Sequence, residues 1–107
     1  MADKSLFVGF MGDSPMMKVL DYLITERELD FSITDMAENA GIGRATLYRV
    51  WDDLIKNKII IHTRDIGKAK LFKLNTANTK IKKLIEVYDL LTLEELKKHS
   101  KKIELAV

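Results

Sequence analysis

The stretch that most constrains the fold of this chain is Gly41 to Ile61, GIGRATLYRVWDDLIKNKIII. Apolar residues in it recur at three- and four-residue spacing, which places them on one face of a helix. They are Leu47, Val50, Trp51, Leu54 and Ile55. The residues that point away from this face in the first two turns are Arg44, Thr46, Tyr48 and Arg49. The pattern predicts a helix with one side packed on a core and a polar, cationic surface on the other.

A second, shorter helix is predicted just before this one. Thr34 is placed to cap its N-terminus, and Met36 and Ala37 lie on its inward face. Gly41 suits the tight turn that ends it. Asn57 suits a left-handed end of the longer helix. A short helix, a turn and a second helix with polar residues at its N-terminal end form a helix-turn-helix motif.

A helix and a short extended segment are predicted upstream of this motif. Ser14 can cap the helix, Pro15 fits its first position, and its apolar stripe continues to about Glu28. Phe31 and Ile33 alternate with polar residues, which is consistent with a short strand or an extended link.

Two strands are predicted downstream, over Lys58 to Arg64 and Lys70 to Leu74. The loop between them, residues 65–69, contains Gly67, which accepts a positive φ. Alternation in the second strand places Leu71 or Phe72, together with Leu74, against the core. A hairpin directly after the second helix of a helix-turn-helix is a wing.

Both ends of the chain contain apolar residues, which we expect to pack on the body of the protein or on a second subunit. Leu6 to Phe10 is predicted to be a strand or an arm. A helix begins near Thr79, and Thr92 with Glu95 fits a capping box that would start a further helix at Leu93. The apolar area left on these helices, with residues 6–10 and 103–107, predicts a homodimer interface. The expected fold is mainly α with a small β-hairpin wing (α+β): a winged helix-turn-helix with two extra C-terminal helices.

Composition excludes several classes of protein. The chain has no cysteine, so disulfides and thiolate metal sites are excluded. No apolar run reaches the length of a membrane span, and the apolar N-terminal segment is shorter than a signal peptide, so we expect a cytoplasmic protein. The histidines, His62 and His99, have no partners at metal-ligand spacing, and no catalytic motif or phosphate-binding loop is present. We therefore expect no cofactor, no metal and no enzymatic activity.

Charge is unevenly distributed along the chain, although the net charge is only +2. Residues 1–55 contain five Lys/Arg and ten Asp/Glu, a balance of −5, whereas residues 56–107 contain thirteen and six, a balance of +7. The basic half includes the expected wing and C-terminal helices, and basic surface is what a polyanion requires.

The segment ITDMAENAGIGRATLYRVWDDLIKNKII resembles winged helix-turn-helix transcription regulators. The likeness covers roughly residues 14–74 and is greatest to small prokaryotic and archaeal regulators of the ArsR and MarR kind. It carries the alanine of the first helix, the glycine of the turn, the apolar residue that fills it, and the run R-A-T-hydrophobic-Y-R. The His- and Cys-rich metal sites of ferric-uptake regulators and the ArsR-type metal motif are not matched. The resemblance implies a DNA-binding unit over residues 14–75. From their apolar residues, we expect residues 1–13 to be an N-terminal arm or strand and the C-terminal helices over residues 76–107 to mediate dimerisation.

The resemblance also implies a set of DNA contacts, with the second helix in the major groove. Arg44 is the candidate for a guanine or phosphate contact and Arg49 for a phosphate, while Thr46 and Tyr48 reach a base or the backbone. The wing would reach the adjacent minor groove or backbone, with Arg64 in the groove and Lys68 and Lys70 on phosphates. The full set is Gly43, Arg44, Thr46, Tyr48, Arg49, Arg64, Lys68 and Lys70. The expected function is sequence-specific binding of double-stranded DNA by a homodimeric transcription regulator, and the alternative is a winged-helix protein-interaction module of a larger complex.

Overall fold

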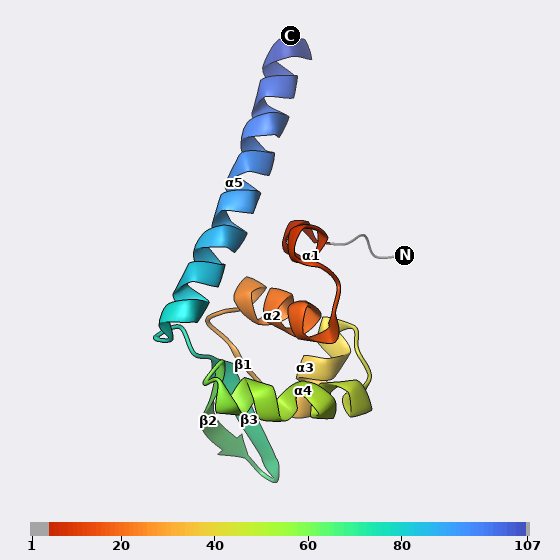
Figure 1. Ribbon diagram of the computed structural model, residues 1–107, viewed down its shortest axis with the longest axis vertical. Helices are drawn as coiled ribbons and strands as arrows, with labels where there is room; N and C mark the ends of the chain where they lie inside the picture. Colours follow the sequence, from red (N-terminus) through yellow and green to blue (C-terminus); the bar gives the residue numbers. More distant parts are fainter. Residues whose placement is uncertain (1–4, 107) are drawn as a thin grey trace.

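The computed structural model describes residues 5–106, with the side chains of residues 5–100. In the described residues, four helices, a small sheet and the start of a fifth helix form one body. The rest of the fifth helix projects from this body (Figure 1). The molecule measures 56 × 31 × 24 Å along its principal axes. The elements in chain order are α1 (Leu6–Met11), α2 (Pro15–Thr25), β1 (Asp30–Phe31), α3 (Ile33–Ala40), α4 (Arg44–Lys56), β2 (Ile60–Ile66), β3 (Ala69–Leu74) and α5 (Thr79–Ala106).

The predicted helix-turn-helix is formed by α3 and α4, and the wing by β2 and β3. Gly41 ends α3 in the left-handed conformation, at φ 73°. The cap of α3 is Ser32, whose Oγ accepts from the N–H of Asp35 at 3.1 Å, so the predicted Thr34 cap is two residues too late. The left-handed residue after α4 is Lys58, at φ 55°, in place of the predicted Asn57.

The sheet has three antiparallel strands in the order β1-β3-β2. β2 and β3 are joined by a two-residue turn, Gly67–Lys68, rather than the predicted five-residue loop. Gly67 has a φ of 60°, and glycine as the first turn residue is the pattern of a type II′ hairpin. A bulge at Thr63 shifts the register between His62 and Arg64.

The core lies where α2, α3 and α4 meet the sheet and the start of α5. It consists of buried apolar side chains only: Phe7, Val19, Leu20, Leu23, Ile24, Met36, Ala37, Leu47, Leu54, Ile60, Phe72, Leu74 and Ile81. α2 begins as predicted, with Ser14 as cap and Pro15 in the first turn, but it ends at Thr25, before the predicted Glu28. Both Leu71 and Phe72 of β3 are buried, whereas the sequence predicted only one of them.

The predictions for the two termini were wrong in secondary structure. Leu6 to Phe10 lies in a short helix, not in a strand or arm, because Ser5 caps it and Phe7 packs in the core. The C-terminal region is one continuous helix, α5, not two. Thr92 does not cap a new helix, since its hydroxyl donates to the carbonyl of Tyr88 within α5 at 3.1 Å. The predicted interface residues 103–107 lie outside the described side chains.

Candidate nucleic-acid interface

The helix α4 has a buried and an exposed face, as its sequence predicted, except that Ile55 is 45% exposed and not part of the buried face. Ile55 follows the fully buried Leu54 by one residue, which turns its side chain about 100° around the helix towards solvent. Leu47 and Leu54 are fully buried. Trp51 packs edge-on against Phe72, with ring centroids 4.9 Å apart, so it belongs to the core margin and is not a platform for stacking bases. This packing fixes the rotation of α4 about its axis. The opposite face is therefore held outward as a rigid surface.

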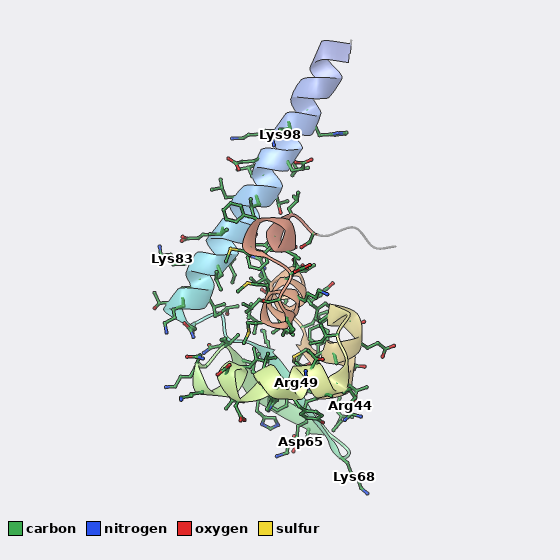
Figure 2. The ribbon with its side chains drawn as sticks, turned by 45° about the vertical axis from the view of Figure 1, so that its right-hand side comes forward. Arg44, Arg49, Asp65, Lys68, Lys83 and Lys98 are labelled. Atoms are coloured by element: carbon green, nitrogen blue, oxygen red, sulfur yellow. The ribbon has the colours of Figure 1, made fainter. Side chains whose placement is uncertain are left out.

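The exposed face of α4 carries two arginines and a tyrosine near its N-terminal end. Nη2 of Arg44 donates to Oη of Tyr48 at 3.1 Å, and the guanidinium lies 5.8 Å from the centre of that ring. Tyr48 is 49% exposed, and Arg49 is also exposed. Within the described part of the chain neither arginine forms an ion pair with a carboxylate. Both cations are therefore available to an anionic partner. Figure 2 labels the two arginines on α4.

Gly43 precedes α4 and leaves its N-terminus without a side-chain cap. Its carbonyl accepts from the N–H of Leu47 at 3.0 Å, as the residue before a helix does. The first-turn N–H groups of a helix lack partners inside it and carry partial positive charge. The half-buried Thr46 lies in this first turn. This end of α4 therefore adds N–H donors to the cationic surface made by Arg44 and Arg49.

The wing ends in a second cationic surface. Lys68 is in the turn, at the far end of the hairpin from the body, and Lys70 is one residue into β3 (Figure 2). Both are exposed and neither forms an ion pair within the described residues. The acidic residue of this hairpin, Asp65, instead binds Nε2 of His62 through Oδ1 at 2.6 Å.

Arg64 is placed differently from the two lysines. It lies three residues before the turn, and its guanidinium binds the carboxylate of Asp30 on β1, with Nε to Oδ2 at 3.0 Å and Nη2 to Oδ1 at 3.2 Å. The pairing lowers the pKa of Asp30 to about 2 and raises the pKa of Arg64. This partner could not be predicted from the sequence, because the two residues are 34 positions apart and no periodicity connects them.

Among the residues that the structure describes, the remaining features do not suggest another site. A small open pocket of about 230 Å³ between α1 and α5 is lined by Ser5, Leu6, Phe7, Tyr88 and Thr92. Tyr88 Oη is hydrogen-bonded to Thr25 Oγ1 at 2.7 Å. No group of three or more potential metal ligands occurs among the described residues. None of the helices in the described range is long and apolar enough to cross a membrane.

Comparison with known proteins gives similarity of structure but not of sequence. No protein-family model matches the chain, and no curated protein sequence matches it. Among solved structures, MepR, a transcription regulator of the Staphylococcus aureus multidrug efflux pump MepA, has a TM-score of 0.61 and 15% identity, over 92% of this chain and 77% of that one. ZitR of Lactococcus lactis, solved in complex with DNA, has a TM-score of 0.59 and 17% identity, over 86% and 68%. Sso10a-2, a DNA-binding protein from Sulfolobus solfataricus, has a TM-score of 0.52 and 17% identity, over 84% and 93%.

The chain therefore has the winged helix-turn-helix fold of these proteins. The expected α+β fold class is confirmed. At identities below one in five the likeness establishes the fold alone, so the role of each residue depends on the geometry described above.

Proposed function

We propose that this protein is a transcription regulator that binds double-stranded DNA in a sequence-specific manner. The observation that supports this most strongly is the pair Arg44 and Arg49. Both are exposed and have no carboxylate partner among the described residues, and they lie on a helix whose other face is buried. Arginine is the side chain best suited to bind guanine edges and phosphates with two hydrogen bonds. The DNA-binding proteins among the structural neighbours support the same function.

In this proposal the N-terminal half of α4 enters the major groove. Arg44 and Tyr48, which already contact each other, reach base edges, while Arg49 and the N–H groups after Gly43 bind phosphates, with Thr46 at the groove edge. The wing contributes Lys68 and Lys70 to the adjacent backbone. Arg64, on the same hairpin, completes the proposed set of contacts at the adjacent minor groove.

The protein is further proposed to act as a homodimer. Five large apolar side chains on α1 and α5 are 45–68% exposed: Leu6, Phe10, Leu90, Leu93 and Leu96. A second copy of the chain that packs on this surface removes it from water, which is favourable. A dimer of this fold sets its two reading helices one turn of DNA apart, about 34 Å, and therefore favours a palindromic site. A cytoplasmic location and the absence of catalytic and metal-dependent activity belong to the same proposal.

Selection of bound sequences from a pool of random duplexes tests this function. We expect a palindromic motif with half-sites about one helical turn apart. Affinity for the selected duplex should fall steeply as salt rises, because each phosphate contact releases counterions. Enrichment of no motif, with no duplex binding at low salt, would contradict the proposal.

The alternative function, a protein-interaction module of a larger complex, is favoured by the same exposed leucines on α5. It predicts that the protein purifies with a different, stably bound protein and binds no duplex at low salt. The selection experiment and a measurement of the assembly state together separate the two functions.

A further inference from the structure

The carboxylate of Asp30 joins the two outer strands of the sheet across the strand between them. Asp30 lies on β1 and is paired with Lys73 of β3, while β2 lies on the other side of β3. The carboxylate accepts from Oγ1 of Thr63 at 2.6 Å and from Nε and Nη2 of Arg64 at 3.0 and 3.2 Å. A two-residue strand at the base of the wing is thereby fastened to the strand that leads to the wing tip.

The bulge in β2 makes this double contact possible. Consecutive side chains of a regular strand point to opposite faces of the sheet, so neighbouring residues cannot normally bind one carboxylate. Thr63 is the extra residue between His62 and Arg64, and a bulge redirects the side chains at its position. Both Thr63 and Arg64 therefore reach Asp30.

Arg64 remains able to bind a second partner while it is held. A guanidinium has five N–H donors, and the pair with Asp30 engages one on Nε and one on Nη2. The side chain of Arg64 is 62% exposed, whereas that of Asp30 is only 18% exposed. The three remaining donors lie on the hairpin that also carries Lys68 and Lys70.

We propose that Asp30 is a positioning residue that holds Arg64 in one orientation for the minor groove of duplex DNA beside the site read by α4. The proposal rests on the proposed function. A flexible arginine binds phosphates of any sequence. A guanidinium oriented by a bidentate carboxylate presents its donors in one direction and is sensitive to the width and base edges of the groove. Asp30 also offsets the charge of Arg64, so it lowers general attraction to phosphates while it raises discrimination.

The variant Asp30→Asn should separate these two effects, because it should raise affinity for any duplex and lower discrimination between duplexes. Its affinity for a random duplex should rise, and the slope of log affinity against log salt should steepen by about 0.9, because Arg64 becomes free to bind a phosphate. Its discrimination between the selected duplex and duplexes altered under the wing should fall about tenfold, to the level of Arg64→Ala. In Arg64→Ala both affinity and discrimination should fall, and adding Asp30→Asn to that variant should reduce discrimination no further.

Thr63→Val is the matched control, because it removes the second contact of Asp30 and leaves the pair with Arg64 in place. It should retain discrimination even if hydrogen exchange in the wing becomes faster. Arg64→Lys tests the positioning role without changing β1. Lysine keeps the positive charge but cannot form the bidentate contact with Asp30, so affinity should persist and discrimination should fall.

The results distinguish a failure of the positioning role from a failure of the proposed function. Wild-type discrimination in both Asp30→Asn and Arg64→Lys overturns the positioning role alone. Loss of discrimination in Thr63→Val equal to that in Asp30→Asn also overturns it, because the contact then matters only to the structure of the wing. A wild-type protein that prefers no duplex overturns the proposed function, and this proposal with it.

Discussion

At the scale of single residues, the interface depends on which cations are already paired within the protein. Arg44 and Arg49 on α4 and the wing lysines have no acidic partner among the described residues, whereas Arg27 and Arg64 each bind a carboxylate through two nitrogens. Sequence composition counts all of these cations equally. Their surroundings distinguish the cations that are unpaired within the described residues from those that a carboxylate holds in one orientation.

The pair of Asp30 and Arg64 should be lost in acid. The folded-state pKa of Asp30 is about 2, below its ordinary value of 3.8, so the carboxylate is more stable ionised in the folded protein than in the unfolded one. The contribution of Asp30 to stability is therefore present above about pH 4 and is lost as pH falls towards 2. An NMR titration of the Asp30 carboxyl should give a midpoint near 2 in the wild type. In Arg64→Ala the midpoint should move up towards 3.8, and an unshifted midpoint in that variant would contradict the assignment.

Lys58 should be replaceable by glycine with a gain in stability. Its φ of 55° is one that side chains with a Cβ avoid, at a cost of roughly 1–2 kcal/mol. Part of this gain is offset by the greater freedom of glycine in the unfolded chain. Lys58→Gly should therefore raise the free energy of unfolding by about 0.5–1 kcal/mol in urea titrations. Lys56→Gly, a change within α4, should lower it, and a loss in both variants would show that the backbone of Lys58 is not strained.

At the scale of secondary-structure elements, α1 is held by one buried aromatic ring. Phe7 is 1% exposed, and its ring centre lies 5.8 Å from that of Tyr88 on α5. Phe7→Ala should lower the free energy of unfolding by about 3 kcal/mol, because it leaves a cavity between α1 and the core. Leu29→Ala is the control, since Leu29 is 53% exposed and lies outside the proposed dimer surface. Equal effects of the two substitutions in thermal unfolding would contradict the placement of α1.

The amphipathic helix α4 was predictable from its periodicity, whereas the short helix α1 and the continuity of α5 were not. The faces of α4 follow from the spacing of Leu47, Val50 and Leu54, because only a helix brings residues at this spacing onto one face. Residues 6–10 are too few for helical and strand periods to be distinguished, so burial of Phe7 decided the outcome. Thr92 and Glu95 match a capping box, but the same spacing occurs inside a helix, where no Gly or Pro interrupts α5.

The candidate site also has one part that was predictable from the sequence and one part that was not. The predicted reading surface of α4 is local in sequence, so its residues were found together. Arg44, Tyr48 and Arg49 are exposed, whereas Thr46 is half-buried. Their contacts with DNA stay a prediction. The contact of Asp30 with Thr63 and Arg64 depends on a bulge and on strand order, and neither is encoded at a spacing that a single sequence reveals.

At the scale of the whole molecule, α5 separates the two proposed binding surfaces in space. Its first turns pack on the body, where Ile81 is buried, and its later turns extend away from α4 and the wing (Figure 1). Arg27 binds Asp89 with Nη2 to Oδ1 at 2.9 Å, which connects α5 to the end of α2. The surface proposed to bind DNA and the surface proposed to bind a second copy are therefore at opposite ends of the molecule.

Charge placed on the exposed leucines of α5 should disrupt the proposed dimer. Leu93→Glu and Leu96→Glu should give a monomer in sedimentation experiments, because they place a carboxylate in an apolar interface. Affinity for a palindromic duplex should fall by more than tenfold, since one half of the protein then binds alone. Leu29→Glu alters a leucine that is 53% exposed and far from α5 in sequence, and it should leave the dimer intact. A dimer that persists in both α5 variants would place the interface elsewhere.

The most direct test of the account is a binding titration of Arg44→Ala and Arg49→Ala against the selected duplex, with Lys98→Ala on the far part of α5 as control (Figure 2). Each arginine variant should remain folded and lose about tenfold or more in affinity, whereas the lysine variant should bind nearly as the wild type does. Wild-type affinity in both folded arginine variants would contradict the claim that the exposed face of α4 binds DNA.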